Sequence, residues 1–218
     1  MIWRYLPLAG IVLIIVIGGI VRPLIQLRRH GTLGISLFRR GRAQAVRDVL
    51  FVLLLAGFIV HTIATARGSA WVHRLVAEGS VPSDMLQVVG ALLMIAGTVL
   101  FAAAQIDLGA SWRIGIDPGA APGLVSRGLY RLCRHPIFSG FLMIFAAYAA
   151  LLPTLLSLVL LAAGYLLLRA QADAEEVHML RTYGESYRDY AKRVGRFMPG
   201  IGKGRQVKQG SSRRSPNC

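Results

Sequence analysis

The longest uncharged run in the chain reads HPIFSGFLMIFAAYAALLPTLLSLVLLAAGYLLL, residues 135–168 with histidine counted as neutral. A single helix of this length would extend about 51 Å, whereas the apolar core of a bilayer measures about 30 Å. Pro153 lies near its middle and lacks the backbone N–H that a continuous helix would need. The run therefore predicts two antiparallel membrane helices that turn near Leu152.

Three further segments are long and apolar enough to cross a bilayer once. They contain no Asp, Glu, Lys or Arg and comprise Tyr5–Val21, Val49–Ala66 and Met85–Ile106. The first has the length of a signal peptide, but it lacks a clear small-residue cleavage site and leads into a basic loop, so we expect a retained anchor. Together with the hairpin, these segments predict an all-α integral membrane protein with about five transmembrane helices.

The charge distribution predicts the orientation in the membrane. The chain has 218 residues, of which 55% are hydrophobic, and carries 25 Lys and Arg against 10 Asp and Glu. The net charge of +15 alone would suggest nucleic-acid binding, but with this hydrophobicity it favours basic cytoplasmic loops, and we expect no nucleic-acid partner. Basic residues follow the first, third and fifth predicted spans, whereas the 67–84 loop is neutral overall. Five spans place every basic segment on one side, with the N-terminus outside and the C-terminus in the cytoplasm.

Other kinds of site are not supported by the sequence. Cys133 and Cys218 are the only cysteines, which excludes a disulfide-built secreted domain. The five histidines show no metal-ligand spacing, so we expect no metal site. No glycine-rich loop follows a strand, which argues against a soluble nucleotide-binding domain.

Charged residues flank the hairpin at the two ends that should meet in the cytoplasm. Equal steps from a turn at Leu152 pair Arg131 with Asp173, and helix geometry then brings Arg134 within side-chain reach of the next acidic residues. The expected cluster comprises Tyr130, Arg131, Arg134, His135, Glu175 and Glu176. A simpler interpretation treats these residues as interfacial anchors and solvated charges at helix ends.

The start of the hairpin also predicts an anion site. Pro136 suits the first turn of a helix, where its missing N–H costs nothing. The free N–H groups of that turn and the nearby Arg134 would attract a carboxylate or phosphate. Glu175 and Glu176 offer the opposite charge a few ångströms away. A zwitterion such as an amino acid head group could therefore be held by both.

An apolar stripe follows the last span at steps of three or four residues. It consists of Val177, Leu180, Tyr183, Tyr187, Tyr190, Ala191 and Val194. This spacing predicts an amphipathic helix on the cytoplasmic bilayer surface, which Gly184 could divide and which could cover the charged cluster. The basic, Gly- and Ser-rich segment 200–218 predicts a disordered tail that could contact anionic lipid.

The order of these motifs resembles the isoprenylcysteine carboxyl methyltransferase and phospholipid methyltransferase superfamily. The residues that carry the resemblance are Gly128-x-Tyr130-x-x-x-Arg134-His135-Pro136-x-x-x-Gly140, Glu175-Glu176, Tyr183-Gly184-x-x-Tyr187-x-x-Tyr190 and Arg196-Phe197-x-Pro199. Upstream, Ser111-Trp112-Arg113-x-Gly115-Ile116 is similar to bacterial members, which implies a bacterial inner membrane. The resemblance divides the chain into N-terminal membrane helices (1–107), a methyltransferase core (108–199) and the tail (200–218).

The resemblance implies a membrane enzyme that transfers a methyl group from S-adenosylmethionine to a lipophilic acceptor. The implied cofactor-binding residues are Tyr130, Arg134, His135, Pro136, Glu175 and Glu176, with Arg134 and Glu176 as the catalytic pair. Arg131, Trp112 and Tyr187 are expected to contact the acceptor. Phe138 departs from the tyrosine that many relatives carry there, which removes a hydroxyl group.

The nature of the acceptor stays open between two chemistries. A carboxylate is already ionised at neutral pH and needs only orientation, which Arg131 or Arg134 could supply. An amine would need a base, for which Glu176 is the natural candidate. Family likeness favours O-methylation of a carboxylate, with N-methylation of a phospholipid amine as the alternative. A non-catalytic adaptor that binds anionic lipid through its basic segments is a further alternative.

Overall fold

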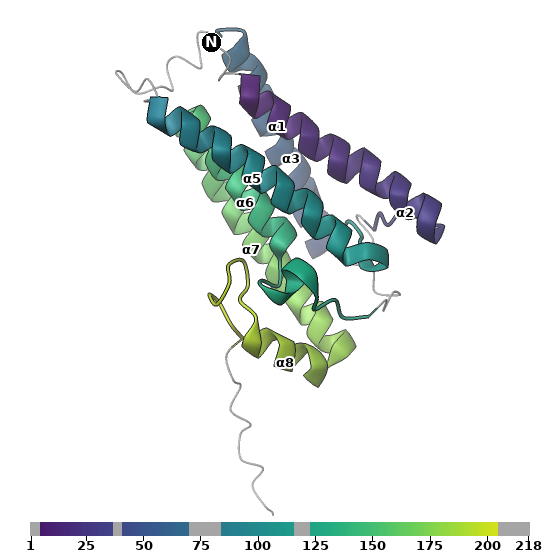
Figure 1. Cartoon of the computed structure of the whole chain (residues 1–218). Coiled ribbons are helices and arrows are strands. Elements are labelled where there is room, and N and C mark those ends of the chain that lie inside the picture. Colours follow the sequence, from purple (N-terminus) through teal and green to yellow (C-terminus); the bar gives the residue numbers. More distant parts are fainter. Residues whose placement is uncertain (1–4, 37–40, 70–83, 116–122, 205–218) are drawn as a thin grey trace, which may run out of the picture.

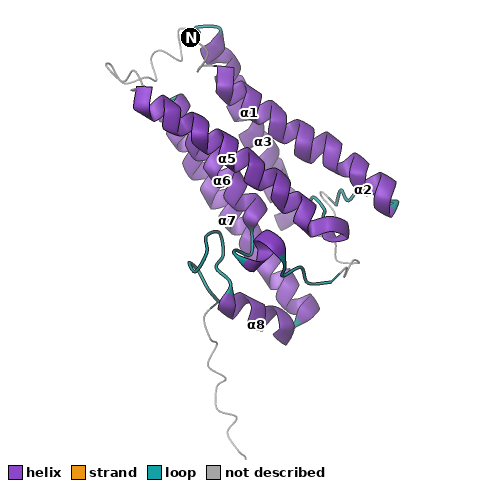
Figure 2. Ribbon diagram, in the orientation of Figure 1, coloured by secondary structure: helices purple, strands orange, loops and turns teal. Residues whose placement is uncertain are grey.

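The computed structural model describes residues 5–36, 41–69, 84–115 and 123–204, and these form a bundle of long helices (Figure 1). Helices and loops account for all of the described chain, as Figure 2 shows. The helices are α1 (Leu6–Ile14), a π-helical continuation (Ile15–Val21), α2 (Arg22–His30), α3 (Gly41–Ala66), α5 (Asp84–Leu108), α6 (Pro136–Leu151), α7 (Leu155–Tyr183) and α8 (Glu185–Arg193). Two short 3-10 helices, Gly109–Ser111 and Gly128–Arg131, lie between α5 and α6. The prediction of an all-α protein is confirmed.

Four helical stretches are long and apolar enough to cross a membrane, so the chain is an integral membrane protein. They are Leu6–His30, Gly41–Ala66, Asp84–Ser111 and Leu155–Arg193. Helix α6, the fourth predicted span, has 16 residues and a length of about 24 Å. It is therefore shorter than an average bilayer core of about 30 Å.

The hairpin turns where Pro153 predicted it. Helix α6 ends at Leu151 and α7 begins at Leu155, so the uncharged run is indeed two helices. Thr154 caps the second helix, because its side chain accepts a hydrogen bond from the Ser157 N–H at 3.0 Å while the Ser157 hydroxyl accepts one from the Thr154 N–H at 3.0 Å. This reciprocal capping satisfies backbone groups at the start of the helix.

A buried polar network fastens the hairpin turn to α3. The ring of His61 is fully buried, with Nδ1 2.7 Å from the Tyr148 hydroxyl and Nε2 3.2 Å from the Thr154 hydroxyl. The Thr62 hydroxyl lies 3.1 Å from the same tyrosine oxygen. Polar groups with protein partners are tolerated in apolar surroundings, so this end of the hairpin can lie within the membrane.

Helices α5 and α6 pack with their backbones in close approach at two glycines. A Cβ added at Gly140 would lie 2.9 Å from the backbone nitrogen of Phe101, and one added at Gly97 would lie 3.0 Å from the carbonyl oxygen of Gly140. Only glycine allows helices to approach so closely. The contact sets the position of α6, whose first residue directly follows the charged motif.

Helix α7 extends beyond the bundle and carries the acidic motif to the end where α8 folds across it (Figure 1). Its 29 residues span about 44 Å, which exceeds the bilayer core. Gly184, with φ of 54°, ends α7 and starts α8. Of the predicted apolar stripe, Val177 and Leu180 are exposed on α7. The buried part of the stripe, Tyr187, Tyr190, Ala191 and Val194, forms a small separate core.

The predicted tail differs from the structure at its first residues. The Gly202 carbonyl accepts a hydrogen bond from Arg134 at 3.1 Å, and the Gly204 N–H donates to the Ala191 carbonyl at 2.9 Å. Residues 200–204 are therefore part of the folded core. The remainder of the predicted tail, including Cys218, lies outside the described residues.

Candidate functional site

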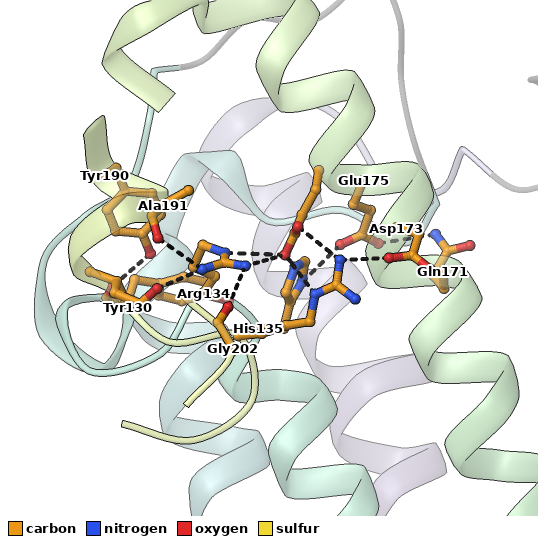
Figure 3. Close-up of polar contacts among 12 residues, drawn as sticks. Tyr130, Arg134, His135, Gln171, Asp173, Glu175, Tyr190, Ala191 and Gly202 are labelled. Atoms are coloured by element: carbon orange, nitrogen blue, oxygen red, sulfur yellow. Dashed lines mark hydrogen bonds and ion pairs between the residues drawn. The ribbon is translucent and has the colours of Figure 1, made fainter. Parts of the chain in front are cut away.

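Arg134 joins the start of the hairpin to α7 and to the segment after α8 (Figure 3). Its side chain is almost fully buried, and its Nη2 and Nε lie 2.9 and 3.1 Å from Oε1 of Glu176, 42 residues away in sequence. Nη1 donates to the carbonyl oxygens of Ala191 and Val194 at 3.2 and 2.5 Å. The predicted meeting of the two motifs is confirmed, and every nitrogen of this guanidinium has a protein partner.

Glu176 is the centre of an ion-pair network. Besides Arg134, its carboxylate accepts hydrogen bonds from Arg196 at 2.8 and 3.0 Å and lies 3.2 Å from Nε2 of His135. Burial alone would raise the pKa of Glu176, but the hydrogen bonds from His135 and Arg196 and the charge of Arg134 hold that pKa well below its usual range. Glu176 is therefore firmly ionised and a weak proton acceptor.

Arg196 is a further member of this network and was not among the predicted site residues. Its Nη2 also donates to Asp173 at 2.6 Å, and its backbone N–H donates to the Ile201 carbonyl at 2.8 Å. The backbone of His135 donates to the Arg196 carbonyl at 3.0 Å, which aligns the two motifs side by side. The available signal was its place in the Arg196-Phe197-x-Pro199 motif that carries the resemblance.

His135 lies between two consecutive carboxylates. Its Nδ1 is 3.4 Å from Glu175 and its Nε2 is 3.2 Å from Glu176. Burial lowers the pKa of His135, but the hydrogen bonds and charges of Glu175 and Glu176 outweigh it, so the net shift is upward. The ring stacks on Phe138, with centroids 5.2 Å apart and planes 3° from parallel. Phe138 therefore positions the imidazole through ring contact instead of through a hydroxyl.

A cavity of about 490 Å³ lies beside the network, within the usual range of ligand pockets of about 300–1,000 Å³. Of the predicted site residues it is lined by Trp112, Tyr130, Arg134, His135, Glu175 and Tyr187. Glu176 is not among the lining residues, because its carboxylate points into the ion-pair network. Arg131 is exposed and Pro136 is buried at the start of α6, and neither lines the cavity. The consecutive acidic residues thus have different surroundings.

Aromatic side chains form the wall of the cavity nearest α8. The Tyr190 hydroxyl donates to the Tyr130 carbonyl at 2.6 Å, which ties α8 to the turn before the hairpin. Burial and the nearby Glu175 carboxylate raise the pKa of Tyr130, and burial likewise raises the pKa of Tyr187. The phenols stay neutral at physiological pH and offer flat, weakly polar surfaces to a ligand.

The turn that carries Tyr130 is held by Asp107 at the end of α5. The Leu129 N–H donates to Oδ2 of Asp107 at 2.7 Å, and Gly128 has φ of 56°. The positive φ favours glycine, and a Cβ here would lie 2.3 Å from that carboxylate oxygen and displace it. This contact explains the glycine at the start of the Gly128–Pro136 motif.

The family model described as phospholipid methyltransferase matches residues 85–186. Methanethiol S-methyltransferase of Pseudomonas deceptionensis is 37% identical over 73 residues, which cover 34% of this chain and 27% of that protein. Protein-S-isoprenylcysteine O-methyltransferase A of Arabidopsis thaliana is 33% identical over 113 residues, or 50% of this chain and 57% of that protein. The matched part therefore spans between about a quarter and somewhat more than half of these relatives.

A solved structure of a eukaryotic intramembrane Ras methyltransferase, isoprenylcysteine carboxyl methyltransferase, has the same fold. The TM-score is 0.59 at 18% sequence identity, over 86% of this chain and 63% of that one. Two enzyme names with different methyl acceptors thus occur among the sequence relatives. On this evidence, residues 85–186 are similar to the phospholipid methyltransferase family, and the chain shares the fold of isoprenylcysteine carboxyl methyltransferase.

Proposed function

We propose that the protein is an S-adenosylmethionine-dependent membrane methyltransferase that O-methylates a carboxylate on a lipophilic acceptor. The observation that carries this proposal is the Arg134–Glu176 pair, which closes the hairpin onto α7 and places Glu175 and His135 on the cavity wall. A charged cluster beside an apolar cavity is the arrangement that a soluble, charged cofactor and an apolar acceptor both require.

The donor set of the cavity fits S-adenosylmethionine, which supplies an electrophilic methyl group on a sulfonium centre. Glu175 offers a carboxylate to its ammonium group, and Tyr130 and Tyr187 offer aromatic surface to its adenine. We assign Arg134 and Glu176 the role of positioning residues, since their charged groups bind each other and the segments around the cavity. His135 keeps Glu175 and Glu176 in place from between them.

The state of Glu176 supports a carboxylate acceptor over an amine. N-methylation needs a base to take a proton from the ammonium form, and Glu176 was the candidate. Its lowered pKa and its position in the ion-pair network make it unsuited to that task. A carboxylate acceptor needs no base, so orientation in a cavity shielded from water supplies the rate enhancement.

For the topology we propose five membrane segments, with the short α6 as the fourth, an outside N-terminus and a cytoplasmic C-terminus in a bacterial inner membrane. The basic last turn of α2, with Arg28, Arg29 and His30, supports a cytoplasmic end there. The charged cluster and the start of α1 lie at opposite ends of the bundle (Figure 1). In the proposed orientation the cluster faces the cytoplasm, where a soluble cofactor could reach it.

The test uses the full chain in lipid nanodiscs with S-adenosylmethionine radiolabelled on the methyl group. Acceptors are N-acetyl-S-farnesylcysteine, phosphatidylethanolamine and an alkyl thiol, offered separately. We expect label on the farnesylated carboxylate, released as methanol by mild alkali because the product is an ester. Label on the amine or the thiol would replace the proposed acceptor class, and absence of cofactor binding would refute the enzyme assignment.

A further inference from the structure

Arg47 lies on α3, outside the segment that matches the family model, yet it lines the same cavity as His135 and Glu175. Its guanidinium is oriented by two neutral amides. Nε donates to Oε1 of Gln171 at 3.1 Å, and Nη2 donates to Oε1 of Gln44 at 2.7 Å. The Gln44 side chain is itself fully buried, so this arginine has a fixed position.

The charge of Arg47 differs from the other arginine charges of the site, because no carboxylate is paired with it in the described part of the chain. Arg134 and Arg196 each pair with Glu176, whereas Arg47 forms no salt bridge with any carboxylate in the described part of the chain. Amide oxygens orient a guanidinium without neutralising it. A half-buried cation beside an apolar cavity is unfavourable unless an anion joins it, which makes Arg47 a binding point for an anionic ligand group.

The wall next to Arg47 is apolar apart from Asp48, whose carboxylate accepts a hydrogen bond from Nε2 of Gln44 at 2.6 Å. Phe51, Val52 and Leu55 follow on the same helix and line the cavity, as do Ile14 of α1 and Gly18 of the π-helical continuation. The cation therefore stands at one end of a surface made of hydrocarbon and aromatic groups. An amphiphile with an anionic head and an apolar tail complements this arrangement.

One side chain connects Arg47 to the charged cluster. Gln171 accepts from Arg47 through Oε1 and donates through Nε2 to Oε1 of Glu175 at 3.0 Å. An anion bound at Arg47 would thus lie beside the part of the cavity that Glu175 and His135 line.

We infer that Arg47 binds the acceptor's carboxylate and selects acids over neutral lipids, an inference that rests on the proposed function. In the reaction, one carboxylate oxygen forms a bond to the methyl carbon as the bond from that carbon to sulfur breaks. The electron pair of the broken bond stays on sulfur, and no proton is transferred. Because the ion pair with Arg47 forms already in the bound acceptor, this residue acts on acceptor affinity more than on turnover.

The experiment measures equilibrium binding of N-acetyl-S-farnesylcysteine and of its primary amide to the full chain in nanodiscs. We expect the wild type to prefer the carboxylate at least tenfold and Arg47→Gln to reduce this preference below threefold, while Arg47→Lys retains most of it. Arg42→Gln, an exposed arginine on the same helix, is the matched control and should leave the preference unchanged. Kinetically, Arg47→Gln should raise KM for the acid about tenfold with kcat within threefold.

A second variant guards against loss of folding. Gln171→Glu would place a carboxylate against Arg47 and abolish the preference without removing the arginine. An unchanged preference in both Arg47→Gln and Gln171→Glu would overturn the inference. So would a tenfold weaker affinity of Arg47→Gln for S-adenosylmethionine with the acid preference intact, because Arg47 would then serve the cofactor. A wild type that prefers the acid in binding but transfers no methyl group would refute the proposed function and still support Arg47 as an anion site.

Discussion

Glu175 and Glu176 are consecutive on α7, yet Glu175 lines the cavity and Glu176 points into a network of two arginines and a histidine. A helix turns about 100° per residue, so neighbours on its surface can face different environments. The double acidic motif therefore combines two tasks, which substitution can separate.

Glu176→Gln should destabilise the fold by about 3 kcal/mol, because Arg134 would keep its buried charge without its counter-ion. Glu175→Gln should change the free energy of unfolding by less than about 1 kcal/mol, since Glu175 is more exposed, but it should weaken S-adenosylmethionine binding at least tenfold. Thermal unfolding and calorimetric titration measure the two effects. Glu185→Gln, at an exposed ion pair on α8, is the control for both. Equal loss of stability in the two variants would contradict the division of tasks.

Arg196→Gln should weaken the link between α7 and the segment after α8. A double-mutant cycle with Glu176→Gln should give a coupling free energy of about 1–2 kcal/mol, because the contact is double and partly buried. The same cycle between Arg188→Gln and Glu185→Gln, an exposed pair, should give about 0.5 kcal/mol or less. A coupling of that small size for Arg196 would show that Arg134 alone holds Glu176.

Gly140→Ala should destabilise the packing of α5 on α6 by about 1–3 kcal/mol, because the new methyl group would meet the backbone of Phe101. Backbone cannot move aside as a flexible side chain can. Gly19→Ala is the matched control, since the nearest atom to its Cβ is a methyl carbon of Ile15 at 4.0 Å. Unfolding in detergent compares the variants, and equal midpoints would show that the two helices can separate without loss.

The raised pKa of His135 predicts that the free energy of unfolding decreases as the pH rises. Its pKa is raised in the folded protein, so the charged imidazole contributes stability in full below the unfolded value of about 6.5, and the contribution disappears as the pH rises through the folded pKa. We expect the unfolding temperature of the wild type to decrease as the pH rises above about 6.5. His135→Asn, which lacks this titration, should show a flatter profile over the same range. Parallel profiles for the two proteins would contradict a charged His135.

Much of the architecture follows from local sequence. The uncharged run with Pro153 predicted the hairpin because helix length and the missing proline N–H act within a few residues. The approach of Arg134 to Glu176 was also predictable, since a hairpin converts distance along the chain into register along two helices. Gly184 marked the break before α8 for a similar local reason.

The tertiary structure alone decided which charges face a ligand. Glu175 and Glu176 are chemically identical in the sequence, and only the rotation of α7 against Arg134 and Arg196 separates their surroundings. Arg47 lies far from the motifs along the chain and reaches the cavity because α3 packs against α7 through Gln171. Side-chain direction and contacts between distant helices depend on the packing of the whole bundle, which no short stretch of sequence encodes.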